Sequence, residues 1–329
     1  MRFLGYVCLM DMFPWLAKPH QTEPRILEWA RRYPHLVQLD TEHQWSHTAY
    51  AVTVTDRAVP DADKRKCLIT VPHGHEPAGT VACMNTLSRL LDGRALDGTP
   101  SGLDRAAMLA RTLLTFLPDA NPEGRSRSPE EFWDGSIYSN DEFLDFAFGL
   151  DEAGHRFKRV DRWRIGEEDC ARVGIAYERI NETTYVEPNR DWESSFFRLL
   201  HRLTRRHEYH QLLDLHQTEF EGSPHNCVIL LPVIWDELPG PIREYSQAWA
   251  QAITDGWRAI AEAHPQNPYP LSYTGQQRAY FEQRWGDLYR TLPHVTVEIQ
   301  NNNPRTPADL QRRLAEAAID VSLQRLLAP

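Results

Sequence analysis

The chain has 329 residues, of which 41% are hydrophobic and 25% charged, a composition typical of globular proteins with a sizeable core. Its formal net charge of -10 gives no electrostatic reason to expect a nucleic acid or an anionic membrane as a partner. No stretch approaches the roughly 20 apolar residues of a membrane span. Asp11 interrupts the apolar N-terminal run and no signal-peptide cleavage site follows, so we expect a cytoplasmic protein.

Runs with apolar residues at helical spacing alternate along the chain with short β-branched or alternating runs, which indicate helices and strands respectively. In chain order, these patterns predict a helix at 24–33, strands at 49–55 and 67–71, a helix at 80–91, a strand at 113–117, a helix at 194–206, strands at 212–218 and 227–233, a helix at 241–263, a strand at 295–299 and a helix at 307–327. Two prolines and a glycine predict a loop at 118–124. Because no repeat or low-complexity linker interrupts this series, we expect a single α/β domain over residues 1–329.

Residues 125–177 are polar and aromatic and show little regular period. Long irregular stretches in compact domains are typical of lids and binding loops. We therefore predict that this segment is an insertion, or lid, over a cleft, with decoration of the surface as the alternative.

A polar turn between the predicted strand at 67–71 and the next helix carries His73 and Glu76. Open α/β sheets place their functional sites at such carboxyl ends of strands. One imidazole and one carboxylate are two of the three protein ligands of a catalytic zinc site, and His216, near the end of a later predicted strand, supplies a second imidazole. His75, between the first two residues, is a competing ligand.

Glu298 is an acidic residue in the otherwise apolar strand predicted at 295–299. A carboxylate in a buried strand is costly unless it is paired, linked to a metal or exposed in a cavity. Its position predicts a general base that takes a proton from a zinc-bound water. The alternative is a carboxylate at a strand end in contact with solvent.

These motifs, taken in order, resemble those of the M14 family of zinc metallocarboxypeptidases. The series consists of His73-Gly-His-Glu76, Asn121-Pro-Glu-Gly124, Arg179-Ile-Asn181, Glu187-Pro-Asn189-Arg190, Asp214-Leu-His216 and Thr296-Val-Glu298. The resemblance extends from the helix at 24–33 to the last of these motifs and covers most of the chain. It implies a mixed central β-sheet flanked by helices on both faces, one zinc ion per chain, and removal of C-terminal residues from peptides by metal-bound water.

The resemblance also implies a role for each residue of the metal site. His73, Glu76 and His216 would bind zinc, and the general base would be Glu298. Glu187 stands where the family usually has an aspartate that orients the first zinc histidine, and it is one methylene longer.

The substrate-binding residues follow from the same resemblance. Asn189 and Arg190 would hold the terminal carboxylate of the substrate, a contact to which a planar guanidinium is suited. Arg179 would polarise the scissile carbonyl and stabilise its oxyanion. Arg125 and Arg127 compete for that role, because they lie closer to the Asn-Pro-Glu-Gly motif. Arg179 is preferred, because it keeps the family's close approach along the chain to the Asn-Arg pair.

The tyrosine that covers bound substrate in the family lies upstream of the catalytic glutamate. Tyr273 is our preferred candidate here, ahead of Tyr280. Asp287, in the same region, is a candidate for recognising a cationic side chain, with an ordinary surface residue as the alternative.

Two other functions compete with a carboxypeptidase. The first is a zinc-dependent deacylase of N-acyl amino acids, similar to aspartoacylase and succinylglutamate desuccinylase, whose motifs are also similar to residues 74–79 and 214–218. The second is a binding module that has kept the fold without catalysis. In either enzyme, the partner would be a peptide or an N-acyl amino acid with a free carboxylate.

Overall fold

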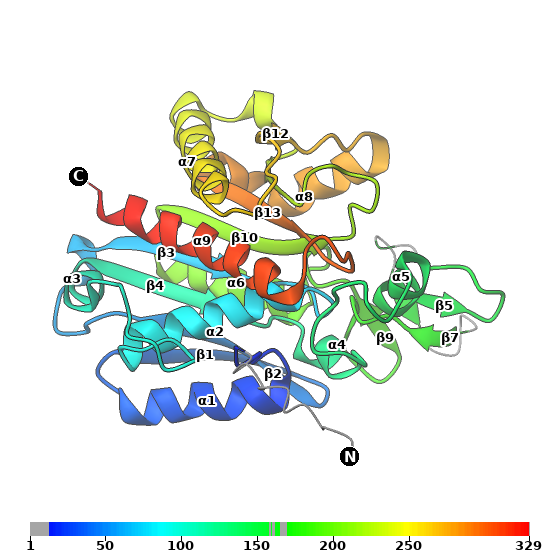
Figure 1. Cartoon of the computed structure of the whole chain (residues 1–329), viewed down its shortest axis with the longest axis horizontal. Helices are drawn as coiled ribbons and strands as arrows, with labels where there is room; N and C mark the ends of the chain where they lie inside the picture. Colours follow the sequence, from blue (N-terminus) through cyan, green and yellow to red (C-terminus); the bar gives the residue numbers. More distant parts are fainter. Residues whose placement is uncertain (1–12, 158, 160–161, 165–169, 329) are drawn as a thin grey trace, which may run out of the picture.

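A mixed sheet of eight strands runs through the centre of the protein (Figure 1). The computed structural model describes residues 13–157, 159, 162–164 and 170–328. The strands of the central sheet lie in the order β1 (Val37–Gln44), β2 (His47–Val54), β4 (Thr112–Leu117), β3 (Arg65–Thr70), β10 (Gln211–Thr218), β13 (His294–Gln300), β11 (Cys227–Leu231) and β12 (Tyr269–Pro270). The central strands β4, β3, β10 and β13 are parallel, whereas β1 and β2 pair antiparallel with their neighbours. The strand β11 pairs antiparallel with β13 and parallel with the edge strand β12.

Helices cover both faces of this sheet, which confirms the predicted α/β architecture. One face packs against α1 (Pro19–Arg32), α2 (Pro77–Leu91), α7 (Gly240–Arg258) and α9 (Ala308–Leu327). The other face packs against α6 (Ser195–Arg206) and α8 (Gly275–Thr291). Figure 1 shows α2 and α9 in front of the sheet and α6 behind it. Among the described residues, none of the helices combines the length and the apolar character that a membrane crossing requires.

Along the strand β13, apolar and polar side chains alternate. Val295, Val297 and Ile299 are buried in the core on the side of α7 and α9. Because successive side chains of a strand point to opposite faces, His294, Thr296 and Glu298 face the other side. The alternation therefore places polar residues of this strand together on one face of the sheet.

The loop predicted at 118–124 is wrong in its second half, where the short helix α4 (Pro122–Ser126) begins. Asn121 caps this helix, because its side-chain oxygen accepts a hydrogen bond of 2.9 Å from the N–H of Gly124. Pro122 occupies the first helical position, where no backbone donor is needed. Pro122, one of the two prolines that suggested a loop, thus begins a helix.

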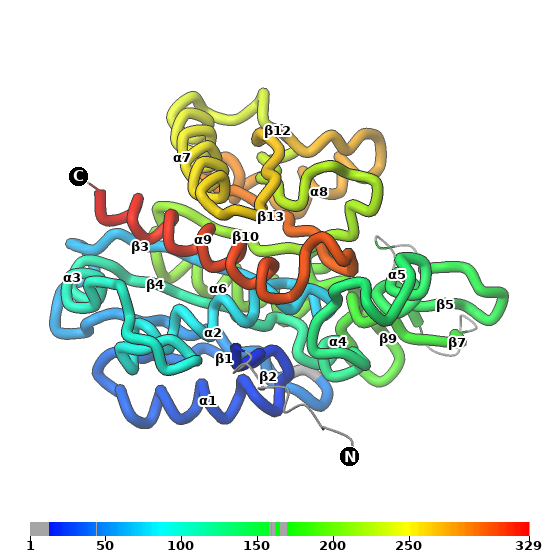
Figure 2. The backbone as a smooth tube through the Cα atoms, in the orientation of Figure 1, coloured from blue at the N-terminus to red at the C-terminus, as the bar shows by residue number. Residues whose placement is uncertain are grey.

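Residues 140–186, where described, form a side lobe next to the main sheet, and Figure 2 traces it in green at one end of the molecule. The lobe contains α5 (Asn140–Phe148), a small sheet of β5 (Gly149–Asp151) and β7 (Cys170–Val173), and another of β6 (Trp163–Arg164), β9 (Thr184–Val186) and β8 (Glu178–Arg179). Its aromatic residues pack on one another, with Trp163, Tyr177 and Tyr185 in one cluster. The segment that lacks a sequence period is therefore more regular than predicted.

Several elements have no counterpart among the sequence predictions. They include α8, the edge strand β1, the helix α3 (Arg105–Arg111) and the 3₁₀ turns Asp61–Asp63 and Trp235–Glu237. In α8, the large buried side chains, Phe281, Trp285 and Tyr289, recur only at every fourth position, and most of the other residues are polar. This narrow apolar stripe reads weakly in a sequence window.

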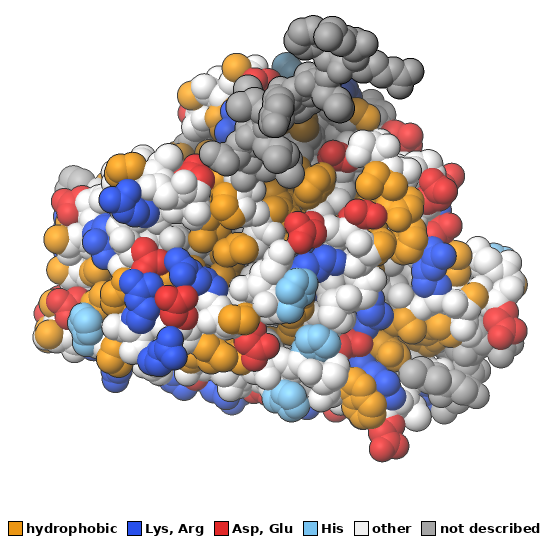
Figure 3. All heavy atoms as spheres, turned by 60° about the horizontal axis from the view of Figure 1, so that its bottom comes forward, with side chains coloured by type: hydrophobic (Ala, Val, Ile, Leu, Met, Phe, Trp, Pro, Cys, Tyr) orange, Lys and Arg blue, Asp and Glu red, His pale blue; other side chains and the backbone are white. Residues whose placement is uncertain are grey.

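The basic outer side of α6 is partly neutralised by acids of the neighbouring strand β1. Arg206 Nη1 lies 2.6 Å from Asp40 Oδ2, and Arg202 forms an ion pair with Glu42. On the face shown in Figure 3, Lys and Arg side chains likewise lie among Asp and Glu side chains. The basic run in α6 thus has its counter-charges within the fold.

Candidate metal centre

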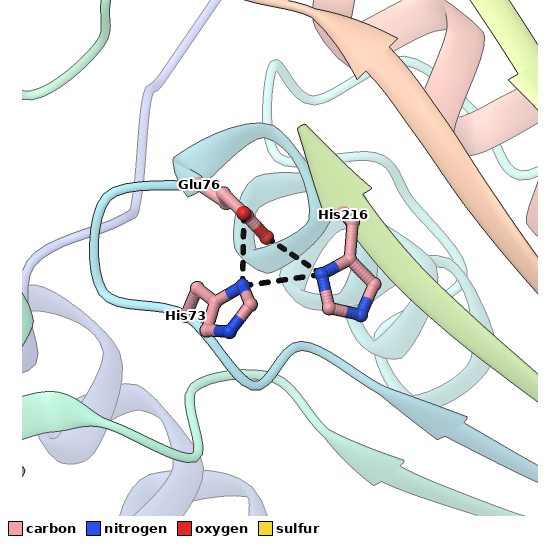
Figure 4. Close-up of side chains that lie close together, drawn as sticks. All are labelled: His73, Glu76 and His216. Atoms are coloured by element: carbon pink, nitrogen blue, oxygen red, sulfur yellow. Dashed lines mark hydrogen bonds and ion pairs between the residues drawn. The ribbon is translucent and has the colours of Figure 1, made fainter. Parts of the chain in front are cut away.

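His73, Glu76 and His216 converge at the carboxyl ends of two adjacent strands (Figure 4). His73 and Glu76 lie in the turn between β3 and α2, and His216 lies on β10. His73 Nδ1 is 2.8 Å from Glu76 Oε1, and His216 Nδ1 is 3.1 Å from both Glu76 Oε2 and His73 Nδ1. All three side chains are buried, and their candidate ligand atoms lie within 4.8 Å of one another.

The turn that carries His73 is held by close backbone packing and by Arg125. A Cβ atom on Gly74 would lie 2.6 Å from the backbone nitrogen of Arg125 and 2.9 Å from the carbonyl oxygen of Ile175, so only glycine fits there. Arg125 Nη2 donates hydrogen bonds of 3.0 Å to the carbonyl of His73 and to the hydroxyl of Thr80. Arg125, one of the alternatives for the oxyanion role, therefore supports the turn.

Two carboxylates orient the histidines from behind. His73 Nε2 lies 2.7 Å from Glu187 Oε1, and His216 Nε2 lies 2.8 Å from Asp214 Oδ2. A carboxylate that accepts the Nε2 proton leaves the Nδ1 lone pair of each ring directed into the cluster, as in metal sites where a carboxylate supports a histidine ligand. Asp214 had no predicted role, although an acid two residues before a histidine, on the same face of one strand, is the signal that could have indicated it.

This donor set fits one metal ion. Two imidazole nitrogens and one carboxylate, buried together around a single point, are the ligands that borderline divalent metals prefer, and they leave a coordination position open. The Nδ1 atoms of His73 and His216 lie 3.1 Å apart, so two N–H groups at these positions would repel each other. A cation near both atoms would instead accept both lone pairs. The residues present are therefore compatible with a bound metal.

Electrostatics in the cluster is dominated by the carboxylates. Burial by itself would lower the pKa of His73 and of His216, but the neighbouring acids outweigh burial and raise both pKa values above the ordinary one. For Glu187, burial would raise the pKa, but Arg159 and Arg190 lower it far below its usual range. The site thus concentrates negative charge that a cation would balance.

A cavity of about 140 Å³ opens beside the cluster. Its wall is formed by His73, His75, Glu76, Phe148, Arg159, Asn189, Arg190, Asp214, His216, Gln217, Thr218, Glu219, Leu230, Leu231, Pro232, Leu271, Tyr273, Phe281, Trp285, Tyr289, His294, Thr296 and Glu298. The cavity brings together most of the residues singled out in the sequence, and Arg179 is not one of them.

Glu298 lines the cavity next to the metal cluster, because β13 pairs with β10 in a register that sets Glu298 beside His216. Burial is the main cause that raises the pKa of Glu298, to about 7; His216 opposes this shift and Glu76 adds to it. In the described part of the chain, Glu298 Oε2 has no hydrogen-bond partner. A carboxylate with these properties can exchange a proton near neutral pH.

Asn189 and Arg190 also line the cavity and are buried. The Arg190 Nε atom forms an ion pair with Glu187, and the guanidinium carbon lies 5.0 Å from the centre of the Phe281 ring. Arg190 Nη1 and Asn189 Oδ1 are buried and lack a hydrogen-bond partner among the residues that the structure describes. A buried guanidinium with an unused donor is a receptor for a carboxylate.

Of the two candidate tyrosines, Tyr273 lines the cavity and Tyr280 does not. The Tyr273 ring packs against Phe281, with 5.2 Å between ring centres. The hydroxyl of Tyr280 instead donates to the carbonyl oxygen of Arg190. Tyr273 is thus placed where it could contact a bound substrate, and its predicted role in covering the substrate stays a prediction.

Arg179 does not line the cavity in the structure. Its guanidinium donates to the carbonyl oxygens of Asn181 and Glu182 in its own hairpin and lies 3.7 Å from the centre of the Trp45 ring. These contacts direct it away from the cavity. The prediction rested on the distance along the chain from Arg179 to the Asn189-Arg190 pair, and the hairpin of β8 and β9 turns the side chain outward.

Arg159, from the side lobe, is the arginine that reaches the metal cluster. Its Nη2 lies 2.6 Å from Glu187 Oε1 and 3.4 Å from His73 Nε2, and its guanidinium carbon lies 5.0 Å from the centre of the Phe148 ring. Sequence reasoning missed this residue, because it lies in the segment without a motif or a period. Only the fold of the lobe brings it to the cavity.

Comparisons with known proteins agree with this architecture. No protein-family model matches the sequence, and no curated protein is similar to it in sequence. The structure is similar to that of carboxypeptidase A from Helicoverpa armigera, with a TM-score of 0.58 and 11% identity over 95% of this chain and 73% of that one. Metallo-carboxypeptidases from Burkholderia cenocepacia (TM-score 0.54, 14% identity, 92% and 67% of the chains) and Pseudomonas aeruginosa (0.54, 14%, 93% and 69%) are also similar. At these identities the likeness shows that the chain has the metallocarboxypeptidase fold.

Proposed function

We propose that this chain is a zinc-dependent exopeptidase that removes the C-terminal residue of a peptide. The observation that supports this is the meeting, in one cavity of a carboxypeptidase fold, of a buried His, Glu, His cluster, a buried arginine with an unused donor and a carboxylate poised near neutral pH. These are an electrophile site, an anchor for an anion and a proton acceptor.

The anchor decides which bond is cleaved. Arg190, with Asn189 beside it, would bind the terminal carboxylate of the substrate through its free Nη1 donor. Glu187 contacts both Arg190 and the ligand His73, so the anchored carboxylate lies within a few side-chain lengths of the metal cluster. The last peptide bond is therefore the one that reaches the cluster.

Zinc held by His73, Glu76 and His216 would supply a Lewis acid for the scissile carbonyl and would lower the pKa of a water molecule in the cavity. Glu298 would accept the proton of the attacking water and return it to the leaving amine. Arg159, which lines the cavity next to the cluster, would donate to the carbonyl oxygen as negative charge develops on it.

The test compares wild-type protein with Glu298→Gln, both loaded with zinc, on N-acylated dipeptides. We expect the variant to keep one zinc per chain by elemental analysis and to lose about 10²- to 10⁴-fold in kcat, because general base catalysis contributes that much. Glu262→Gln, an exposed acid outside the cavity, serves as control and keeps full activity. Normal turnover by Glu298→Gln would contradict the proposed role.

A second candidate is the hydrolysis of N-acyl amino acids, and the small size of the cavity favours it. About 140 Å³, with Phe148 and Arg159 of the side lobe in its wall, leaves little space beyond one amino-acid residue and a short acyl group. The same anchor and cluster would serve both reactions. Turnover of N-acetyl amino acids with no cleavage of dipeptides would select the deacylase.

A further inference from the structure

One wall of the cavity is aromatic and belongs to α8. Phe281, Trp285 and Tyr289 recur every four residues, so they lie along one face of the helix, and all three line the cavity. Trp285 stacks on Tyr289, with 5.8 Å between ring centres and 14° between ring planes. Both rings also stack on His294, at 5.4 Å and 5.1 Å. We call these residues, together with Thr296, the aromatic pocket.

The aromatic pocket extends away from the metal cluster along β13. His294, Thr296 and Glu298 all line the cavity from the same face of the strand. At roughly 3.3 Å per residue, His294 lies about 13 Å along the strand from Glu298. The register with β10 sets Glu298 beside the ligand His216 and His294 beside Leu212. The pocket therefore lies towards the N-terminal ends of β10 and β13, away from the cluster.

The carboxylate anchor adjoins this wall. The Arg190 guanidinium carbon lies 5.0 Å from the centre of the Phe281 ring, and Trp285 Nε1 donates a hydrogen bond of 3.0 Å to the carbonyl of Asn189. A terminal residue whose carboxylate binds Arg190 therefore has its side chain next to the aromatic pocket. Leu230, which pairs with Thr296 across the sheet, adds an apolar surface.

The charged groups of the cavity are engaged elsewhere. The oxygens of Asp214 are occupied by the Thr70 hydroxyl at 2.5 Å and by His216 Nε2 at 2.8 Å. Glu219 follows Thr218, which is at the level of Gln300, so it belongs to the opposite end of the strands from His294. Glu76, Arg159, Arg190 and Glu298 lie around the cluster and the anchor.

No charged side chain of the described residues is therefore free at the His294 end. His294 is buried, and burial lowers its pKa to about 4, which leaves the ring neutral at pH 7. Its Nε2 atom lacks a partner in the described part of the protein. Asp287, the candidate reader of a cationic side chain, is exposed and outside the cavity wall.

We infer that the aromatic pocket of Phe281, Trp285, Tyr289, His294 and Thr296 receives the side chain of the C-terminal residue and selects large uncharged side chains, aromatic ones above all, over basic and acidic ones. A charge placed there would lose its hydration without gaining an opposite charge, whereas a ring gains stacking contacts. The inference uses the proposed function only to identify the bond that is cleaved.

The first test measures kcat/KM of the zinc-loaded protein on N-benzoylglycyl dipeptides that end in Phe, Leu, Lys or Glu. We expect the values for Phe and Leu to exceed those for Lys and Glu at least tenfold. His294→Asp should lower the Phe-to-Lys ratio at least tenfold, because it places a carboxylate at the end of the pocket. Asp287→Asn, on the outer face of α8, should leave the ratio unchanged. Equal or faster cleavage of the Lys or Glu peptide by wild-type protein would overturn the inference.

A binding measurement separates this inference from the proposed function. Isothermal titration calorimetry with 3-phenylpropanoate, 5-aminopentanoate and glutarate compares a ring, a cation and an anion on similar carboxylates, without catalysis. We expect 3-phenylpropanoate to bind at least tenfold more tightly than the others, and Tyr289→Ala to weaken it at least fivefold. That result without cleavage of any peptide would refute the exopeptidase and keep the pocket. Equal binding of the three acids, or no binding, would refute the pocket itself.

Discussion

Glu187 connects the residues that hold the metal with those that hold the substrate. Its two oxygens contact His73, Arg159 and Arg190. The family that the sequence resembles usually has the shorter aspartate here, and the extra methylene extends the reach of the carboxylate between two guanidiniums and an imidazole. A single buried anion with three cationic or donating neighbours holds each of them in one orientation.

Arg159 and Arg179 offer a direct comparison at the scale of single residues. Arg159→Ala should lower kcat about 10²-fold, because removal of one donor to a developing oxyanion costs that much, and Arg179→Ala should change kcat/KM by less than twofold. Steady-state kinetics on the same dipeptide, with zinc content measured for both variants, checks this. A larger loss in Arg179→Ala than in Arg159→Ala would restore the role implied by the resemblance.

At the scale of elements, the side lobe is joined to the main body through Glu178 on β8. Its buried carboxyl group accepts a hydrogen bond of 2.9 Å from the backbone N–H of Ser195, the first residue of α6. Burial raises the pKa of Glu178 from 4.5 to about 8. The folded protein therefore holds this group protonated at pH values where the unfolded chain ionises it.

This shift predicts a loss of stability with rising pH. The stability linked to Glu178 is fully present below about pH 4.5 and is lost as the pH rises towards 8, at about 1.4 kcal/mol per pH unit. Glu178→Gln cannot ionise, so its free energy of unfolding should exceed that of wild type by a few kcal/mol at pH 9 and match it within 1 kcal/mol near pH 5. Urea unfolding across this range, with exposed Glu262→Gln as control, measures the difference; parallel curves for Glu178→Gln and wild type would contradict it.

The element α8 also shows how one helix serves two purposes. Its stripe of Phe281, Trp285 and Tyr289 belongs to the core beneath α6 and at the same time forms a wall of the cavity. The polar residues between them face outward, as the exposure of Asp287 shows. Substitutions in this stripe should therefore change both stability and substrate preference.

At the scale of the whole molecule, the metal cluster joins the β3–α2 turn to β10, segments about 140 residues apart in the chain. A ligand that binds only the folded state stabilises it, by about 2.7 kcal/mol at 100 times its Kd. We expect zinc to raise the Tm of chelator-treated protein by about 4 °C or more, because an unfolding entropy of about 2.1 cal/mol/K per residue gives roughly 1.4 °C per kcal/mol for a chain of 329 residues.

Differential scanning calorimetry with chelator, zinc and magnesium measures this effect. His216→Ala should abolish the response to zinc, whereas His210→Ala, six residues earlier on the chain and outside the cluster, should keep it. Magnesium should have little effect, because imidazole nitrogens are poor ligands for it. An equal response of His216→Ala would place the metal elsewhere.

The sequence by itself determined what depends on neighbouring residues. The strands β3, β4 and β10 begin and end within two residues of their predictions, and the spacing of His73 and Glu76 sets both in one turn at a strand end. Periodicity and short motifs carry this information because a strand or a turn depends on residues that are close in the chain. The helix α8 was not predicted, because its apolar stripe is narrow and lies among polar residues.

Only the tertiary structure decided which arginine reaches the metal cluster and which side chains form the end of the cavity. Arg159 contacts His73 across 86 residues of chain, and Arg179 turns to Trp45 although its spacing to Arg190 predicted the opposite. In the sequence, His294 only precedes the strand predicted at 295–299. The register with β10 and the stacked rings of α8 place it at the end of the cavity away from the metal cluster. Such contacts join distant segments, so they follow from how the elements pack and no local pattern predicts them.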